Sequence, residues 1–322
     1  MIKLINISTY DTDLKRFQYD KEKISDFIYE NNMQGIELLN PRGWDEKVID
    51  KELIKGVHLS YYPNWIDFWK GDKKALFTQF ENEEEIKNYY GGLDPKVLIK
   101  KYREEIKCAD KIGAKYVVFH VSQVYLKETF TYKFCISNRE VIKYTIEFVN
   151  EIFKELDTNI TILFENLWWP GLTFLDKGET KNFIEGIEYE NKGFVLDTGH
   201  LLNGNPYVKN EEDGIEYILK TVSNLGELKD YIKLIHLNLS LSGESTLNKI
   251  KKYRNEELTL KTMKEEIWNH IISIDLHKPF TSKNVQKIIN LIKPIYVTYE
   301  FITRSNEEHR RYIETQNKAL EK

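Results

Sequence analysis

The sequence predicts an α/β protein, a (β/α)8 TIM barrel, and three observations support this prediction. Short apolar, β-branched runs recur along the chain, each followed by a longer segment in which apolar residues recur with helical spacing. The runs are continuous rather than alternating, as is typical of parallel strands buried on both faces. The length of 322 residues is normal for one such barrel. A doubly wound open sheet is the weaker alternative.

The apolar runs predict eight strands. In chain order they are KLINIS (3–8), GIELL (35–39), GVHLS (56–60), KYVVFHVS (115–122), ITILFEN (160–166), GFVLDTG (193–199), IKLIHLN (232–238) and IYVTYEF (295–301). Helical periodicity is clear in segments 97–113, 141–156 and 282–293. Gly113 is a helix-stop signal for the first of these helices, and Pro294 follows the last.

The domain organisation is predicted to be simple. The chain has no linker rich in Pro, Gly or Ser, so residues 1–322 are expected to form one domain. Two long insertions interrupt the strand–helix alternation. The first, at about 61–96, is aromatic and acidic, and the second, at about 240–272, is polar and lysine-rich.

Composition excludes several classes of protein. The chain is 41% hydrophobic, but no apolar run is long enough to span a membrane, and the N-terminus has no signal-peptide pattern. The two cysteines fit no disulfide or metal spacing, which favours a cytoplasmic location. The net charge of −4 offers no general basic footprint for nucleic acid, although an acidic protein can still hold a local cationic groove.

Potential metal ligands gather at the C-terminal ends of the expected strands, where barrel enzymes build their active sites. Six of the eight strands end in such a side chain: His58, His120, Glu165, Asp197, His236 and Glu300. His200 follows Asp197 by three residues, and SIDLHKPF adds Asp275 and His277 between the last two strands. Five of the seven histidines belong to this set.

The convergence of these groups indicates metal binding. A single histidine at a strand end is more often a hydrogen-bonding residue, and a single carboxylate usually caps the next helix. Nine such groups at one barrel mouth would be costly to bury without cations. Mixed imidazole and carboxylate ligands suit zinc, with manganese or iron as substitutes. His270 and His309 lack this context and are expected at the surface.

In their order, these motifs resemble the xylose isomerase-like barrel superfamily and, within it, the endonuclease IV family of apurinic/apyrimidinic endonucleases. The resemblance extends from about the second strand to the eighth. It is carried by NPRGW (40–44), HLSYYPN (58–64), IGAKYVVFH (112–120), FEN (164–166), LDTGH (196–200), IHLN (235–238), DLH (275–277) and YEF (299–301).

The resemblance implies two or three divalent ions, with zinc first among them. His58, His120 and Glu165 would hold one ion. Glu165 would bridge to a second ion, completed by Asp197, His236 and Glu300. A third ion would be held by His200, Asp275 and His277. Glu165 and Glu300 are the expected catalytic residues, and the residues expected to contact substrate are Arg42, Tyr61, Trp168 and Trp169. Arg42 is equally well explained as a solvated loop residue.

The sequence departs from the endonuclease IV pattern around the third ion and the substrate groove. Leu239 follows Asn238 where that family has Asp-Ser, and a long insertion precedes Asp275. KPF (278–280) replaces a glycine-rich stretch. Trp168 and Trp169 stand where the family has small residues.

Two functions from different classes remain open. The complete ligand set favours a metal-dependent phosphoesterase in which metal-activated hydroxide cleaves a phosphodiester, on abasic DNA or a smaller phosphate ester. The alternative is a sugar isomerase or epimerase, which needs only Glu165, Asp197, His236 and Glu300 around one cation. The acidic net charge favours this second function. So do four tryptophans that can stack on a sugar or pack under loops: Trp65, Trp69, Trp168 and Trp169.

Overall fold

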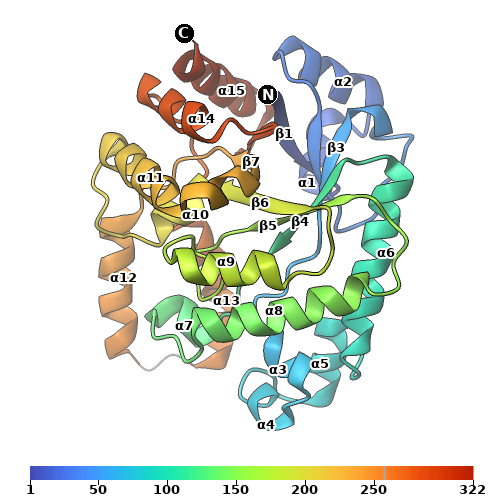
Figure 1. The fold of residues 1–322 in the computed structure, drawn as a ribbon, viewed down its shortest axis with the longest axis vertical. Helices are drawn as coiled ribbons and strands as arrows, with labels where there is room; N and C mark the ends of the chain where they lie inside the picture. The colour runs from blue at the N-terminus through green and yellow to red at the C-terminus, as the bar shows by residue number, and fades with distance from the viewer. Residues whose placement is uncertain (257–258, 322) are drawn as a thin grey trace.

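The computed structural model describes residues 1–256 and 259–321, and its strands form a closed parallel barrel in sequence order (Figure 1). Each strand falls on a predicted run, give or take a residue or two, and β8 pairs with β1 to close the barrel. The strands are β1 (Ile2–Ser8), β2 (Ile36–Leu39), β3 (Ile54–His58), β4 (Tyr116–His120), β5 (Thr161–Glu165), β6 (Lys192–Asp197), β7 (Ile232–His236) and β8 (Tyr296–Tyr299). The barrel prediction is confirmed.

Helices follow the strands and surround the barrel. They are α1 (Asp11–Leu14), α2 (Lys21–Glu30), α3 (Ile66–Lys70), α4 (Lys73–Leu76), α5 (Glu83–Tyr90), α6 (Lys96–Ile112), α7 (Leu126–Thr131), α8 (Asn138–Phe153), α9 (Lys177–Gly186), α10 (Thr198–Asn203), α11 (Glu211–Leu225), α12 (Gly243–Asn255), α13 (Leu260–Ile272), α14 (Gln286–Ile292) and α15 (Asn306–Leu320). Short 3-10 turns are η1 (Lys15–Phe17), η2 (Lys51–Leu53), η3 (Gly226–Tyr231) and η4 (Lys283–Val285).

Local signals set the helix ends. Gly113 adopts a φ of 89° and ends α6, as predicted. Helix α8 begins three residues before the predicted segment because the Ser137 hydroxyl accepts a hydrogen bond from the Glu140 backbone N–H. Lys293 takes a left-handed conformation after α14, and Pro294 prevents the helix from continuing.

Strand alternation divides the core into two layers and also positions the mouth residues. Val118, Leu163, Val195 and Leu234 pack together inside the barrel, whereas their outward neighbours, such as Phe164, pack under the helices. Because side chains on one face recur every second residue, the next inward position on each of these four strands lies nearer the mouth. Those positions are His120, Glu165, Asp197 and His236. Apolar residues therefore fill the barrel floor, and the potential ligands lie directly above them.

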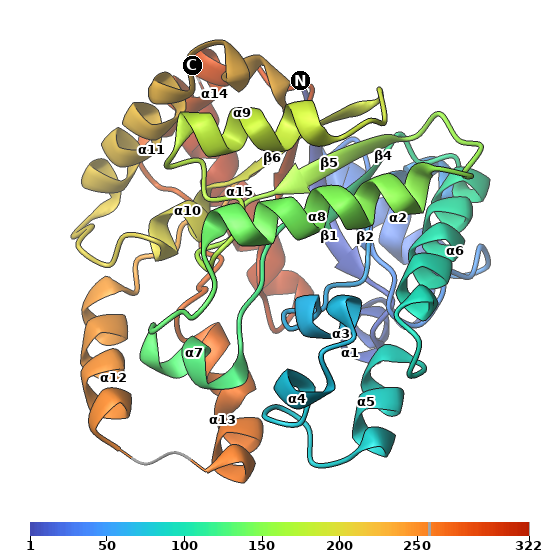
Figure 2. The ribbon, with the colours of Figure 1, turned by 60° about the horizontal axis from the view of Figure 1, so that its bottom comes forward.

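The two insertions form helices at the C-terminal end of the barrel. Residues 61–96 include α3, α4 and α5, and residues 240–272 include α12 and α13, apart from 257–258, which lie outside the described residues. Helix α7 packs against α12 and α13. All of these helices follow the carboxyl ends of β3, β4 or β7, and they lie together beyond the barrel (Figure 2).

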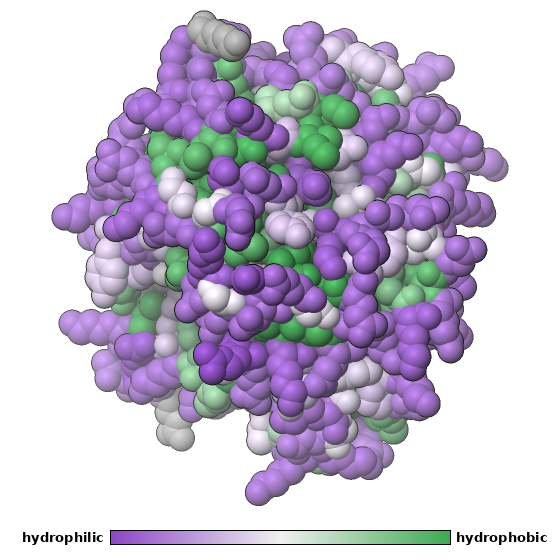
Figure 3. Space-filling view, viewed as in Figure 1, coloured by the Kyte–Doolittle hydropathy of each residue, from purple (hydrophilic) through white to green (hydrophobic). Residues whose placement is uncertain are grey.

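The outer surface is mostly polar. Hydrophilic side chains cover much of the face in Figure 3, and hydrophobic ones are visible mainly between the helices. Among the described residues, no helix combines the length and apolarity needed to cross a bilayer.

The predicted surface positions of His270 and His309 are wrong. Both side chains are buried, His270 on α13 and His309 on α15. His270 stacks on Phe130 at 4.3 Å between ring centroids and its Nε2 lies 2.9 Å from the Thr129 carbonyl oxygen. His309 packs against Phe27, and burial lowers its pKa to about 4. Each helix turns its histidine inward against aromatic rings. The charged residues next to each histidine in the sequence had indicated an exposed position.

Candidate metal centre

The barrel mouth brings together the first predicted ligand group. His58 ends β3, His120 ends β4 and Glu165 ends β5. The His120 Nε2 atom lies 3.5 Å from Glu165 Oε2, and the His58 Nε2 atom lies 3.8 Å from the same oxygen. One ligand atom from each residue lies within 4.8 Å of the others, close enough to hold a single ion.

The second group shares Glu165 with the first. His236 Nδ1 lies 3.4 Å from Glu165 Oε2 and 3.3 Å from Glu300 Oε2. Asp197 completes the group, with its Oδ2 atom 3.8 Å from the same imidazole nitrogen. Glu165 thus stands between the two groups, where a bridging carboxylate would have to lie.

The third group forms in spite of the long insertion. Asp275 Oδ2 lies 2.7 Å from His277 Nε2 and 3.4 Å from His200 Nε2. The chain returns from α13 to the barrel through a bridge between Leu239 and Lys278, whose backbone N–H groups donate to each other's carbonyl oxygens at 2.7 and 3.1 Å. This bridge anchors the segment that contains Asp275 and His277 to the end of β7.

The LDTGH motif connects the second and third groups. Asp197 caps helix α10, and its Oδ1 atom accepts a hydrogen bond from the His200 N–H at 2.6 Å. Its Oδ2 atom accepts from Asn238 Nδ2 at 3.0 Å. A Cβ atom at Gly199 would lie 1.9 Å from Asn238 Oδ1, so only glycine allows this approach. Strand β6 thus ends in a carboxylate, and the first turn of α10 places the imidazole of His200 beside it at the mouth.

Glu37 is a site residue that the sequence analysis missed. It lies on β2, fully buried, with Oε1 2.8 Å from His236 Nε2 and 3.0 Å from His58 Nε2. A glutamate in the middle of a buried apolar strand, GIELL, was the available signal. Because Glu37 faces the Nε2 atom of His236, it favours the tautomer in which Nδ1 is free to bind a metal.

Two further residues hold Glu37 in place. The Tyr116 hydroxyl donates to Glu37 Oε2 at 2.7 Å, and the Thr298 hydroxyl donates to the same atom at 3.1 Å. The Tyr116 ring occupies the space beside Gly56, where a Cβ atom would lie only 2.1 Å from the ring. The glycine of GVHLS therefore makes room for the tyrosine that orients Glu37.

The chemistry of this region fits divalent cations. It contains five carboxylates and five imidazoles, namely Glu37, Glu165, Asp197, Asp275, Glu300, His58, His120, His200, His236 and His277. Among the described residues, no group hydrogen-bonds either oxygen of Glu165 or the Nδ1 atom of His236 in good geometry. Buried polar atoms are normally satisfied, so orphaned atoms converging on one region indicate a missing partner. Zinc accepts this mixture of ligands, and manganese or iron also suit it.

The pKa values show that, without a cation, protonated imidazoles and ionised carboxylates stabilise each other's charges. Burial alone would lower the pKa of His236, but Glu37 and Glu300 raise it well above its usual value. Burial likewise opposes ionisation of Glu37, yet His236 and His58 lower its pKa to about 2. A protonated imidazole cannot bind a metal, so metal binding at this site must release protons.

Comparison with known proteins places the fold in a family. A family model described as a xylose isomerase-like TIM barrel matches residues 89–294, more than half of the chain. The chain belongs to the xylose isomerase-like TIM barrel family. Among curated proteins, none matches this sequence.

Several solved structures share this xylose isomerase-like fold. Endonuclease IV from Thermus thermophilus has a TM-score of 0.55 and 11% identity, with 99% of each chain covered. D-psicose 3-epimerase from Clostridium cellulolyticum has a TM-score of 0.52 and 12% identity, with both chains fully covered. The IOLI protein with a bound zinc atom has a TM-score of 0.51 and 14% identity, covering 99% of this chain and 96% of that one. At such low identity these likenesses show a common fold.

In this xylose isomerase-like barrel, two of the four expected substrate residues, Tyr61 and Trp168, lie beside the ligand groups, and a third, Trp169, packs on Trp168. The Tyr61 ring is 4.7 Å from the His120 ring. Trp168 lies 5.1 Å from the His200 ring and 4.4 Å from Trp169, and both tryptophans are buried.

Other residues named as candidate substrate contacts take different places. Arg42 is 60% exposed and forms an ion pair with Asp11 at 2.9 Å, in agreement with a solvated loop residue. Trp65 is buried and donates a hydrogen bond to the Ser122 carbonyl, and Trp69 packs on Phe148, so both belong to the core.

We expect Glu37→Gln to weaken metal affinity by roughly 10- to 100-fold, the usual effect of removing a carboxylate that orients a ligating histidine. The amide keeps the shape of the side chain but removes the negative charge that faces His236 and His58. Isothermal titration with Zn²⁺ at several pH values measures the affinity. Glu190→Gln, in the exposed loop before β6, is the matched control. Unchanged affinity would show that Glu37 does not act on the ligands.

Proposed function

We propose that this protein is a divalent-metal-dependent hydrolase that cleaves a phosphodiester, either in abasic DNA or in a smaller phosphate ester. The observation that supports this proposal best is that three ligand groups meet at the barrel mouth. Two of them share Glu165, and the third, formed by His200, Asp275 and His277, approaches Glu165 through His200 at 3.0 Å. A single-cation isomerase requires only the second group. The first and third groups are not needed to hold that single cation.

Divalent cations at these groups would lower the pKa of a bound water to near neutrality and offset the charge of the phosphate. The chain's own residues would orient these ligands. Asn238 holds the Asp197 carboxylate, and Glu37 faces the nitrogen of His236 that points away from the second group. Tyr61 and Trp168, beside His120 and His200, would exclude bulk water from one side of the site.

The alternative, a sugar isomerase or epimerase, is favoured by a different observation. Glu165, Asp197, His236 and Glu300 form a complete four-ligand group without the other two. Glu165 and Glu300 would then transfer a proton at a carbon next to a carbonyl. Trp168 offers an aromatic face beside His200, whose Nδ1 atom lies 3.0 Å from Glu165 Oε1, and Trp169 packs on Trp168.

One experiment separates the two functions. Metal-loaded protein is incubated with a labelled abasic duplex, with bis-p-nitrophenyl phosphate and with a panel of ketoses and aldoses. We expect phosphodiester cleavage that chelation abolishes and that His120→Ala removes, because His120 belongs only to the first ligand group. Glu190→Gln serves as the active control. Sugar interconversion without cleavage of either ester, at any metal loading, would overturn the hydrolase proposal.

A further inference from the structure

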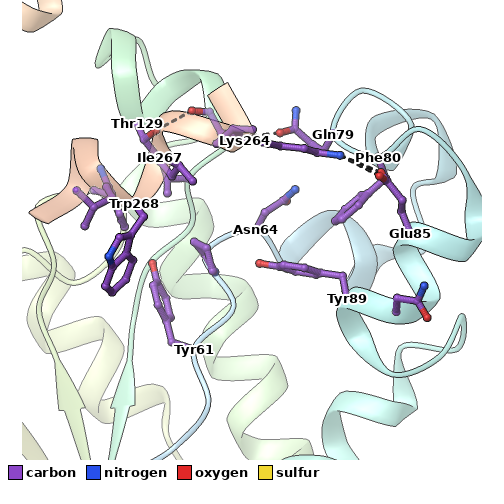
Figure 4. A pocket seen from close by; sticks show the side chains of 16 residues that line it. Tyr61, Asn64, Gln79, Phe80, Glu85, Tyr89, Thr129, Lys264, Ile267 and Trp268 are labelled. Atoms are coloured by element: carbon purple, nitrogen blue, oxygen red, sulfur yellow. Dashed lines mark hydrogen bonds and ion pairs between the residues drawn. The ribbon is translucent and has the colours of Figure 1, made fainter. Parts of the chain in front are cut away.

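A large cavity lies between the two insertions. Its volume is about 760 Å³, within the range of pockets that bind small molecules. Residues from α5, α7, α13 and the loops after β3, β4 and β5 line it. Figure 4 shows Tyr61 and Tyr89 pointing into this space, with Trp268 on the opposite helix facing Tyr61. The cavity therefore depends on segments that the barrel itself does not require.

The lining is aromatic and apolar, with few free polar groups. Its larger side chains are Tyr61, Phe80, Tyr89, Trp169, Trp268 and Ile271. Two of its amides are already engaged with the protein. Asn64 Oδ1 accepts a hydrogen bond from Gln123, and Gln79 Oε1 accepts one from the Leu126 backbone N–H.

The charged groups in the lining neutralise each other. Lys264 Nζ on α13 lies 3.0 Å from each carboxylate oxygen of Glu85 on α5, and this pair joins the two insertions across the cavity (Figure 4). Lys264 is the only basic side chain among the described lining residues, and its pairing with Glu85 leaves no unpaired positive charge there to attract a phosphate or a nucleic acid backbone.

The cavity adjoins the metal centre at two points. Tyr61 lines it and also contacts the ring of His120 in the first ligand group. Trp169 lines it and packs on Trp168, which contacts His200 in the third group. The cavity and the metal centre therefore share an aromatic wall, and a substrate held at the metal centre would lie next to this cavity.

We propose that this cavity binds a neutral, planar ring system carried by an ester group of a small phosphodiester substrate. The proposal rests on the proposed hydrolase function and narrows its substrate class. Aromatic side chains stack on such rings whatever their substituents. A sugar in the same place would leave most of its hydroxyls unpaired, which costs affinity. An aryl group and a nucleobase share the required chemistry.

Binding of the ring is tested separately from hydrolysis. Isothermal titration of the metal-loaded protein uses p-nitrobenzyl alcohol and thymidine as ring probes and glycerol as the probe without a ring. Trp268→Ala removes one wall, and its side chain is 71% exposed, so the fold should tolerate the change. Ile267→Glu replaces an apolar side chain of the lining by a carboxylate. Tyr29→Ala, an exposed aromatic residue on the outer helix α2, is the control.

We expect at least one ring probe to bind, glycerol not to bind, and each pocket variant to weaken ring binding by roughly tenfold. The more tightly bound probe identifies an aryl or a nucleoside substrate. For bis-p-nitrophenyl phosphate, the variants should raise KM and leave kcat unchanged, since the ring is held equally in ground and transition states.

The proposal and the hydrolase function can fail independently. Equal binding of ring probes by wild type and both pocket variants would overturn the ring pocket, even if esters are cleaved. So would hydrolysis of bis-glyceryl phosphate with the same KM as the aryl ester. Ring binding that the variants weaken, without cleavage of any ester, would support the pocket and overturn the hydrolase function.

Discussion

Glu165→Gln is expected to reduce kcat by on the order of 10³-fold or more and to reduce the number of bound metal ions. Removing a residue that merely orients a ligand typically costs 10- to 100-fold. Glu165 contributes to two ligand groups at once, so its loss affects both. The amide can offer only one neutral oxygen where the carboxylate offers two charged ones.

The barrel should survive this substitution. The backbone of Glu165 pairs with His120 on β4 and Val195 on β6, and glutamine keeps those pairings. Elemental analysis of bound metal, the rate of phosphodiester cleavage and the melting temperature are measured together. Glu190→Gln is the isosteric control at an exposed position. A variant with the wild-type metal content and rate would show that Glu165 does not bridge two ions.

The metal-free protein is expected to lose stability as the pH rises from about 6.5 towards 10. Burial favours the neutral ring of His277, but Asp275 raises its pKa to about 10 from an ordinary value of 6.5. The folded protein thus binds this proton more tightly than the unfolded chain. The resulting stabilisation is fully present below pH 6.5 and is lost as the pH rises through 10.

The carboxylates change this expectation little within the same range. Burial raises the pKa of Asp197, which acts in the same direction as His277. His236 lowers the pKa of Glu300 and His277 lowers that of Asp275, so these two groups act only in acid. Bound Zn²⁺ replaces the protons, and the loaded protein should therefore gain stability over the same rise in pH.

Thermal melts of chelated and zinc-loaded protein between pH 6 and pH 10 test this expectation. The melting temperatures should diverge as the pH rises. The double variant Asp275→Asn, His277→Asn removes the pair and should reduce the decline of the metal-free protein, leaving the part that comes from His236, whose pKa Glu37 and Glu300 raise. Parallel curves for the chelated and loaded forms would contradict the assignment of this group as a metal site.

Much of the fold and the candidate site was predictable because both depend on short-range patterns. Continuous apolar runs separated by amphipathic segments indicate buried parallel strands, and chain length favours a barrel. In a parallel barrel, all strand ends meet at one mouth. The position of His120 at the end of β4 and of Glu165 at the end of β5 was therefore enough to predict that they lie together.

The pattern of strand ends could predict only those site residues that lie at the end of a strand. Glu37 lies inside β2, and its role depends on which neighbours its carboxylate meets across the barrel, namely His58 and His236. His309 was misplaced for a related reason. Its helix is rich in charge, and only the packing of α15 against the barrel turns this side chain towards Phe27 and Phe301.

The sequence by itself predicted the barrel, the mouth and nine potential ligands, because six of these residues end predicted strands and the other three stand in the LDTGH and DLH motifs. Only the tertiary structure decided how the insertions contribute. The Leu239–Lys278 bridge returns Asp275 and His277 to the site after the insertion that contains α12 and α13, and the Lys264–Glu85 pair joins two segments that lie far apart along the chain. Both contacts depend on how distant helices pack against each other. No local sequence pattern in one segment indicates which distant segment it will contact.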